Sequence, residues 1–324
     1  MEAVARGRNG PGLRAAAQLR ARLSPAVAIA SLAVLISALA FSVDRWRHET
    51  GISDTQPVAM LPARDATVFF ANLAVLREAG LMKVLAGVRP AEERDYQDFV
   101  RQTGFDYTRD VDVLAASADA RELFFVARGR FDWEKLRRYA EAHGGNCERK
   151  TCDVPTTRPG RWGSFRSIES GVIGLAVSTN KRAVEQLKAR ADSQPARPPL
   201  NEPVWVKISP TALKDPAGLP AALRIFVISL QGADPVVISA GAGDAGTAFA
   251  VRLDATFPSE TAAQATSKQL QLETKMLQLA LQHAQDPPAA GDLTGLLTAG
   301  TFEAAHGHVY GKWPVSVELL RRLE

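Results

Sequence analysis

The chain contains little cysteine and little histidine, two and five residues respectively among 324. So few thiols exclude a disulfide-rich scaffold, and two thiolates alone cannot complete a tetrahedral zinc site. The cysteines, Cys147 and Cys152, enclose four polar residues in "GGNCERKTCDVP". Three interpretations are open for them: a local disulfide across an antiparallel turn, two free thiols, or a redox or metal pair. A location outside the cytoplasm favours the disulfide.

An excess of charge of one sign is also absent from the main part of the chain. Residues 1–48 carry seven arginines against two acids, whereas residues 49–324 carry 32 basic and 33 acidic side chains. The pI of about 9.2 therefore originates in the N-terminal arm. This balance argues against nucleic acid as a partner, because such a surface needs a concentration of positive charge.

One segment lacks charge altogether. Leu23–Val43 is 21 residues long, and as a helix it would span roughly 31 Å, which matches the hydrocarbon thickness of a bilayer. Five arginines precede it and only Glu2 opposes them, so the N-terminus is predicted to be cytoplasmic. The sequence thus predicts a signal-anchor in the cell inner membrane, with a periplasmic C-terminal domain. The alternative is a signal peptide cleaved after Ala40, although the apolar run continues beyond that residue.

The organisation of the chain follows from this segment and from a Pro-rich stretch, "SQPARPPLNEP". About 260 residues follow the apolar run, which is enough for one large or two small cores. The predicted segments are a basic cytoplasmic arm (1–22), a transmembrane helix (23–43), a stalk (44–60), a first α+β half (61–192), a linker (193–203) and a second α+β half (204–324).

Local patterns predict the elements of the two halves. In the first half, they indicate a strand at 66–73, a helix at 91–104, a hairpin of strands 111–117 and 122–130, a helix after Asp132, and strands 161–168 and 171–178. In the second half, they indicate strands at 204–208, 224–230, 235–241 and 247–254, a helix from Ser259 to Gln285, a hairpin at 301–313 and a terminal helix at 315–323. The class is therefore α+β, with antiparallel sheets covered by helices.

The two halves share three short matches in the same order. "VFFANLAVLREAG" matches "WVKISPTALKDPA", Phe125–Arg128 matches Phe249–Arg252, and Gly160-Arg161-Trp162 matches Gly311-Lys312-Trp313. The spacing predicts two duplicated halves.

Several stretches resemble a family of uncharacterised bacterial membrane-anchored extracytoplasmic proteins of unknown function. These stretches are "LPARDATVFFANLA", "TGFDYTRDVD", "RGRFDW", "CERKTCDVP" and "TFEAAHGHVYGKWPVS". The resemblance implies a location and an architecture, and it carries over no functional residue.

Two motifs suggest a dinucleotide site and a metal site, but the residues around them do not fit either kind of site. Gly241, Gly243 and Gly246 form a G-x-G-x-x-G, but a dinucleotide site needs a helix after it, and "TAFAVRLD" predicts a strand. His306 and His308 lack a third ligand at a suitable spacing and are typical of a hairpin tip. No catalytic, cofactor or metal residue is assigned.

One set of basic and aromatic residues is the candidate ligand surface, because together such groups can hold an anionic sugar or a carboxylate-bearing chain. Its members are Arg128, Arg130, Arg161, Trp162, Lys312 and Trp313. The competing interpretation is an arginine stem lying over a packed tryptophan.

The predicted function is that of a single-pass membrane-anchored envelope protein. Its extracytoplasmic α+β domain is expected to bind an envelope protein or a cell-wall ligand, and no catalytic activity is evident. The alternative is an extracytoplasmic hydrolase-type enzyme built from scattered acidic residues. A membrane-bound regulator is the third hypothesis, weakened by a cytoplasmic arm too short for a domain.

Overall fold

The fold was analysed in a computed structural model. It describes residues 56–62, 65–82, 94–187, 202–214, 226–243, 249–283 and 293–315, which all belong to the compact unit Ile52–Glu324. The predicted cytoplasmic arm, the predicted transmembrane helix 23–43, the predicted terminal helix beyond residue 315, and residues 193–201 of the predicted linker lie outside the described residues. Among the residues that are described, no helix is both long and apolar enough to cross a membrane.

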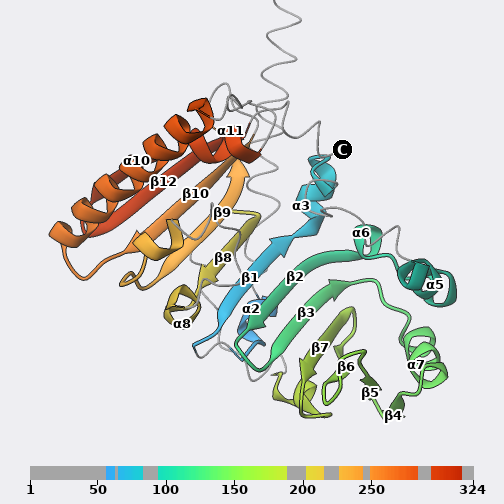
Figure 1. Ribbon diagram of the computed structural model, residues 1–324. Coiled ribbons are helices and arrows are strands. Elements are labelled where there is room, and N and C mark those ends of the chain that lie inside the picture. Colours follow the sequence, from blue (N-terminus) through green and yellow to red (C-terminus); the bar gives the residue numbers. More distant parts are fainter. Residues whose placement is uncertain are drawn as a thin grey trace, which may run out of the picture. The chain divides into compact units, whose positions relative to one another are not determined.

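A single antiparallel sheet of 12 strands organises the described residues. The strand order is β11-β12-β10-β9-β8-β1-β2-β3-β7-β6-β5-β4 (Figure 1). The predicted α+β class is confirmed, with one continuous sheet in place of several.

The first half contributes seven strands to this sheet. They are β1 (Thr67–Asn72), β2 (Val111–Ala118), β3 (Leu123–Gly129), β4 (Asn146–Glu148), β5 (Thr151–Pro155), β6 (Trp162–Glu169) and β7 (Val172–Ser178). Its helices are α2 (Gln56–Ala59), α3 (Leu73–Glu78), α5 (Arg94–Thr103), α6 (Tyr107–Asp110), α7 (Trp133–Ala142) and the 3-10 turn η2 (Ala183–Gln186). The predicted hairpin β2–β3 and the helix after Asp132 are confirmed.

The second half contributes five strands. They are β8 (Val204–Ile208), β9 (Val236–Ala242), β10 (Phe249–Thr256), β11 (Thr301–Ala305) and β12 (His308–Val315). Its helices are α8 (Pro210–Lys214), α10 (Glu260–His283) and α11 (Leu293–Thr298). In Figure 1, α10 lies along β10 and β12, and it contacts β11 and β12.

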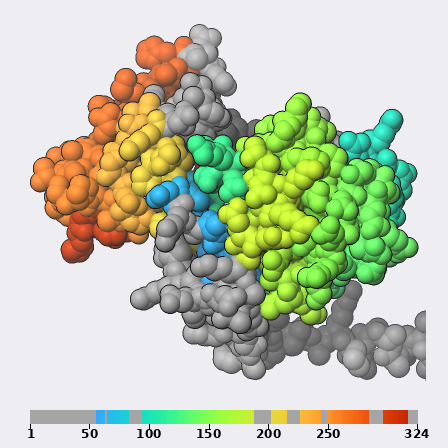
Figure 2. All heavy atoms as spheres, turned by 90° about the horizontal axis from the view of Figure 1, so that it is seen from below, coloured from blue at the N-terminus to red at the C-terminus, as the bar shows by residue number. Residues whose placement is uncertain are grey.

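The two halves follow the same strand order around the central pair β1–β8. In each half three successive strands are neighbours, a helix follows, and the last strand returns beside the third, so β3 pairs with β7 and β10 pairs with β12. β1 and β8 are antiparallel, with Val68 opposite Lys207. In Figure 2 the blue atoms of the β1 region accordingly lie between the green first half and the yellow and orange second half. The hairpin β4–β5 has no counterpart among the described residues of the second half.

Two of the three sequence matches fall on corresponding elements, and the third does not. The matches at β1 and β8 and at β3 and β10 are equivalent by strand order. Trp162, however, begins β6, whereas Trp313 lies in β12, and the counterpart of β12 is β7. The similarity of these two three-residue stretches therefore does not reflect equivalent positions.

Side chains alternate between the two faces of the sheet and build separate cores. In β3, Phe124 and Val126 face a core that includes residues next to α2 and in η2, while Ala127 faces the opposite core with Leu136 of α7. Residues 56–60, assigned to the stalk by the sequence, form α2 and its end, and Met60 is buried in the first of these cores.

One predicted strand is wrong. Residues 226–229, within the predicted strand 224–230, are helical. Phe226 and Leu230 are four residues apart and both are buried, which is the spacing of one helix face. No place remains for a strand between β8 and β9, because these pair directly, with Val206 opposite Ile238.

Candidate functional site

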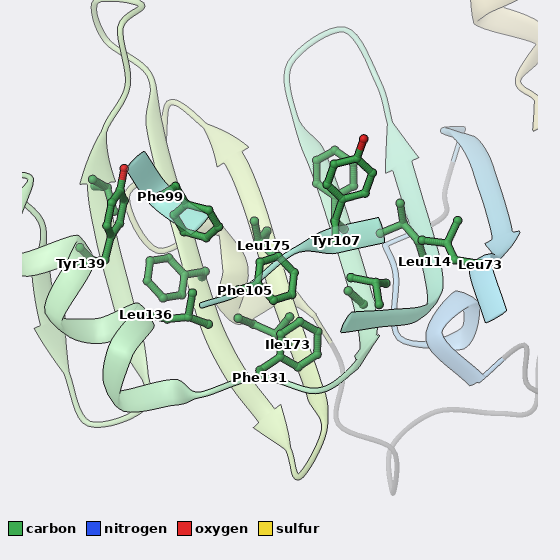
Figure 3. A pocket seen from close by; sticks show the side chains of 16 residues that line it. Leu73, Phe99, Phe105, Tyr107, Leu114, Phe131, Leu136, Tyr139, Ile173 and Leu175 are labelled. Carbon is green, nitrogen blue, oxygen red and sulfur yellow. The ribbon is translucent and has the colours of Figure 1, made fainter. Parts of the chain in front are cut away.

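One cavity lies between the sheet of the first half and its helices α5, α6 and α7, and we call it the apolar cavity. Its volume is about 410 Å³, and no polar surface lines it. The strands supply Val111, Leu114, Phe125, Ala127, Val154, Phe165, Ile173 and Leu175; the helices supply Leu73, Phe99, Tyr107, Leu136, Tyr139 and Ala140; and the connecting segments supply Phe105 and Phe131. In Figure 3 the hydroxyls of Tyr107 and Tyr139 point away from the rings at its centre.

The floor of the apolar cavity contains an exposed leucine in the interior of the sheet. Leu175 lies in β7 between Phe125 of β3 and Phe165 of β6, and 39% of its surface is exposed. A large apolar side chain with sheet neighbours on both sides is usually covered. Its exposure here marks space that the helices leave open above the sheet.

A chain of aromatic contacts forms the roof. Tyr139 of α7 meets Phe99 of α5 edge-on at 5.0 Å, and Phe99 meets Phe105 edge-on at 5.9 Å. Phe105 then stacks on Phe131 at 5.4 Å. Edge-to-face and offset stacks are the favoured arrangements of such rings, so the helices are held over the sheet by side-chain geometry.

Local sequence fixes the position of Phe105. Gly104 ends α5 with a φ of +73°, a conformation that glycine adopts without strain. The hydroxyl of Thr103 donates to the carbonyl of Phe99 at 2.7 Å and accepts from the amide of Phe105 at 3.2 Å. Asp132 fixes the start of α7 in the same way, since its Oδ1 accepts from the amide of Lys135 at 3.1 Å.

A second depression, which we call the charged cleft, adjoins the apolar cavity. Phe105 and Phe131 line both. The cleft is lined by six charged residues: Arg109, Asp110, Arg130, Asp132, Glu134 and Lys135. An apolar cavity and a charged cleft are thus separated by one stacked pair of rings.

Asp110 organises the charged cleft. Arg109 donates to it from Nε at 3.1 Å and from Nη2 at 2.9 Å, and Nη2 of Arg130 lies 3.6 Å from Oδ1. The amide of Asp106 donates to Oδ2 at 2.9 Å. The hydrogen bonds from Arg109 hold the pKa of Asp110 below its ordinary value, against the opposing effect of burial. The carboxylate is therefore ionised at neutral pH.

Two tyrosines beside the roof stay protonated at neutral pH. Burial, with a contribution from the charge of Asp106, raises the pKa of Tyr96 to about 12. Burial also raises the pKa of Tyr107. The hydroxyl of Tyr96 donates to Asp106 at 3.2 Å, so these rings act as neutral packing groups.

The structure does not bring the six residues of the sequence-predicted ligand surface together. Arg128 lies near the end of β3, opposite Val172, while Trp162 lies opposite Ser178. Val172 and Ser178 are six positions apart along β7, which is roughly 20 Å. Arg130 lies in the charged cleft, and Arg161 donates to the carbonyl of Arg121 at 2.8 Å.

The remaining two members lie in the other half of the sheet. Lys312 and Trp313 are successive residues of β12 and face opposite sides. Trp313 meets Phe302 edge-on at 5.2 Å in the core, and Lys312 lines a groove with Arg252 and Asp254. The basic partner of Trp162 is a residue that the sequence did not suggest, Lys181, whose Nζ lies 3.7 Å from the centre of the ring.

The disulfide interpretation of the two cysteines is confirmed. Cys147 of β4 and Cys152 of β5 are opposite each other in register, their α-carbons are 4.0 Å apart and their sulfurs 2.07 Å apart. The pair closes a hairpin at the edge of the sheet, and neither cysteine lines the apolar cavity.

The two failed motifs are hairpins, as predicted. Gly241 lies in β9, Gly243 follows that strand, and β10 pairs antiparallel with β9, whereas Gly246 lies outside the described residues. His306 and Gly307 form the tip of β11–β12 with φ values of +54° and +78°. His308 contacts Asp254 at 2.7 Å through Nδ1, a pair that the sequence did not suggest. Within the described ranges, no three His, Cys, Asp or Glu side chains cluster as metal ligands.

Sequence reasoning missed the apolar cavity, although one signal was available. Three of the four tyrosines lie between residues 96 and 139, beside Phe99, Phe105 and Phe131. The prediction of two helices and a hairpin in this stretch made no use of that concentration of rings.

Comparisons with known proteins add a distant likeness of fold. No protein-family model matches the chain, and no curated protein matches it. Crystal form I of TP0453 is similar with a TM-score of 0.46 and 8% identity over 82% of this chain and 96% of that one. Crystal form III of TP0453 has a TM-score of 0.47 and 7% identity over 82% and 96%. At these values the likeness carries no argument about function.

Proposed function

We propose that this protein is a membrane-anchored binding protein of the cell envelope, and that its α+β domain binds an aliphatic chain in the apolar cavity. The observation that carries the proposal is a cavity of about 410 Å³ without polar lining, with Leu175 exposed on its floor. This volume falls within the range of small-molecule sites.

The lining decides the chemistry of the ligand. A polar group placed inside would lose its hydrogen bonds to water and gain none, at a cost of roughly 2–7 kcal/mol. Each buried methylene, in contrast, stabilises by about 0.8 kcal/mol. A chain of about ten methylenes would therefore gain roughly 8 kcal/mol before the cost of association. This balance favours a saturated chain over a sugar, a nucleotide or a peptide backbone.

The location belongs to the same proposal. The uncharged run Leu23–Val43 and its arginine-rich flank support a transmembrane helix with residues 44–324 outside the cytoplasm. The disulfide Cys147–Cys152 supports an oxidising compartment. The shared strand order of the two halves supports an origin by duplication. The proposed family relationship rests on the sequence resemblance alone.

The test uses the full chain in nanodiscs and a photoactivatable alkyl probe with a diazirine near the end of its chain. Cross-linked residues are mapped by mass spectrometry. We expect adducts on peptides that line the apolar cavity and at least a tenfold loss of this labelling in Leu175→Trp, because an indole placed on the floor fills the space between Phe125 and Phe165.

The control is Leu272→Trp, at another exposed leucine, on α10. This variant should label the cavity peptides like the parent. Labelling that is spread evenly over the surface, or that is equal in Leu175→Trp and the parent, would overturn the proposal.

A further inference from the structure

We infer that the aliphatic ligand carries an anionic head group, and that this group binds in the charged cleft against Arg109 and Arg130. The inference rests on the proposed function, because it names the polar end of the molecule whose chain fills the apolar cavity. The ligand class is a single-chain anionic amphiphile, with a carboxylate or a phosphate as its head.

The first step is the position of the cleft. The apolar cavity and the charged cleft share Phe105 and Phe131 as walls. A chain that leaves the cavity past these two rings therefore meets the cleft directly. No polar group lines the cavity itself, so a head group cannot be satisfied there.

The second step is how the charges of the cleft pair with one another. The six charged side chains that line it are three basic and three acidic, so the cleft as a whole is balanced. The two acids of the α7 side have their own partners: Asp132 lies 3.7 Å from Lys135, and Glu134 accepts from Nη2 of Arg137 at 3.0 Å. Around Asp110, in contrast, Arg109 at 2.9 Å and Arg130 at 3.6 Å share one carboxylate. The positive charge is therefore concentrated locally at these two guanidinium groups, where an anionic head would bind.

The third step is which charges the cleft presents to a ligand. The side chains of Arg109 and Arg130 are 64% and 63% exposed, whereas that of Asp110 is 11% exposed. The carboxylate thus lies beneath the two guanidinium groups and aligns them. Planar guanidinium donors match carboxylate and phosphate oxygens, so the exposed side of this pair is suited to an anion.

The experiment extends the cross-linking assay with competitors. Dodecanoate, dodecyl phosphate and the neutral dodecanol compete with the alkyl probe for the cavity peptides of the full chain in nanodiscs. The concentration that halves the labelling is compared between the parent and Arg130→Gln. Partition of each competitor into the nanodisc is the same for both proteins, so it cancels in that ratio.

We expect Arg130→Gln to weaken competition by dodecanoate or dodecyl phosphate roughly tenfold or more, since hydrogen bonds to a charged partner have about that effect. Competition by dodecanol should change less than twofold. The relative strength of the two anions identifies the head group. Arg121→Gln, at the opposite end of the β2–β3 hairpin, is the matched control and should behave as the parent.

Two outcomes separate this inference from the proposed function. If all three competitors act alike on both proteins, the aliphatic site stands and the anionic head is overturned. If none of them displaces the probe, the proposed function itself fails. A cationic dodecyl amine that competes better than dodecanoate would also overturn the inference.

Discussion

The rings of Phe105 and Phe131 stack with their centroids 5.4 Å apart and 27° between their planes. Phe105 follows α5 and Phe131 precedes α7, so a contact between two connecting segments closes one edge of the apolar cavity. Both rings are half-buried, and their other faces contact the charged cleft. The stability of the roof should therefore depend on the pair as a unit.

A double-mutant cycle on these rings should show coupling. We expect Phe131→Ala to lower the free energy of unfolding by roughly 2 kcal/mol, about half the cost of truncating a fully buried phenylalanine. The coupling with Phe105→Ala should be about 1 kcal/mol, the typical value for an aromatic pair. Urea unfolding followed by near-ultraviolet circular dichroism measures both. A parallel cycle of Phe105→Ala with Phe302→Ala, in the other half, should be additive within about 0.5 kcal/mol.

A close backbone approach at the charged cleft makes Gly129 sensitive to any side chain. A β-carbon at this position would lie 2.0 Å from the carbonyl oxygen of Asp110, whereas one at Gly163 would have 3.8 Å to its nearest neighbour. We expect Gly129→Ala to destabilise by about 3 kcal/mol, because the backbone of two strands must move. Gly163→Ala should change stability by less than about 1 kcal/mol. Thermal unfolding of the two variants checks this difference, and equal stability would contradict the close approach.

The network around Asp110 should appear as a dependence of stability on pH. Its folded pKa is lowered by the hydrogen bonds from Arg109. The stabilisation is therefore present above the ordinary aspartate pKa of about 3.9 and is lost as the pH falls through the lower, folded value. We expect Asp110→Asn to cost about 1–3 kcal/mol at pH 7. As the pH falls below the ordinary aspartate pKa of about 3.9, the difference from the parent should shrink.

Urea unfolding at pH 7, 5 and 3 measures this prediction. Glu303→Gln, on an exposed position of β11, is the control and should differ from the parent by less than about 0.5 kcal/mol at each pH. A difference between Asp110→Asn and the parent that stays constant down to pH 3 would show that the carboxylate charge is not the cause.

The cysteine hairpin permits a test that separates burial from bonding. Cys152 is fully buried, so a lack of labelling in the folded protein proves nothing about the bond. We expect maleimide to label both cysteines only after denaturation with a reductant, and to label neither after denaturation alone. Replacing both cysteines by serine should cost about 2 kcal/mol, as the closed loop is short. Labelling without reductant in the denatured protein would contradict the disulfide.

The strands and the capped helices could be predicted because their signals are local. An amphipathic stretch begins after Asp132 and ends at Gly144-Gly145. The helix α7 forms there as predicted. The hairpins β2–β3 and β11–β12 were predicted in the same way, from alternation and turn residues. The segment 224–230 was mistaken for a strand, because a short apolar run does not distinguish a strand from a helical turn.

The site could not be predicted, because it depends on which segments pair across the sheet. The predicted ligand surface joined Trp162 and Trp313 by similar neighbours in the sequence, yet seven strands lie between β6 and β12. Leu175 is an ordinary strand residue in the sequence, and its exposure follows only from where α5 and α7 cross the sheet. Pairing and helix placement are long-range properties that periodicity does not contain.

The proposed membrane anchor has its own test. With reporters fused at Glu324, we expect an active periplasmic phosphatase and no fluorescence from a cytosolic fluorescent protein, because the arginines before Leu23 stay in the cytoplasm. Leu35→Arg should impair insertion, since an arginine at the centre of such a helix costs about 2.5–3.5 kcal/mol. Leu13→Arg, in the basic arm, is the matched control and should insert normally.

The mass of the membrane-extracted protein distinguishes the anchor from a signal peptide, because cleavage after Ala40 would leave Phe41 as the first residue. Fluorescence from the C-terminal fusion would place the disulfide and the apolar cavity in the cytosol. The proposed envelope location would then be wrong, whereas the proposed binding of an aliphatic chain would still be decided by the cross-linking experiment.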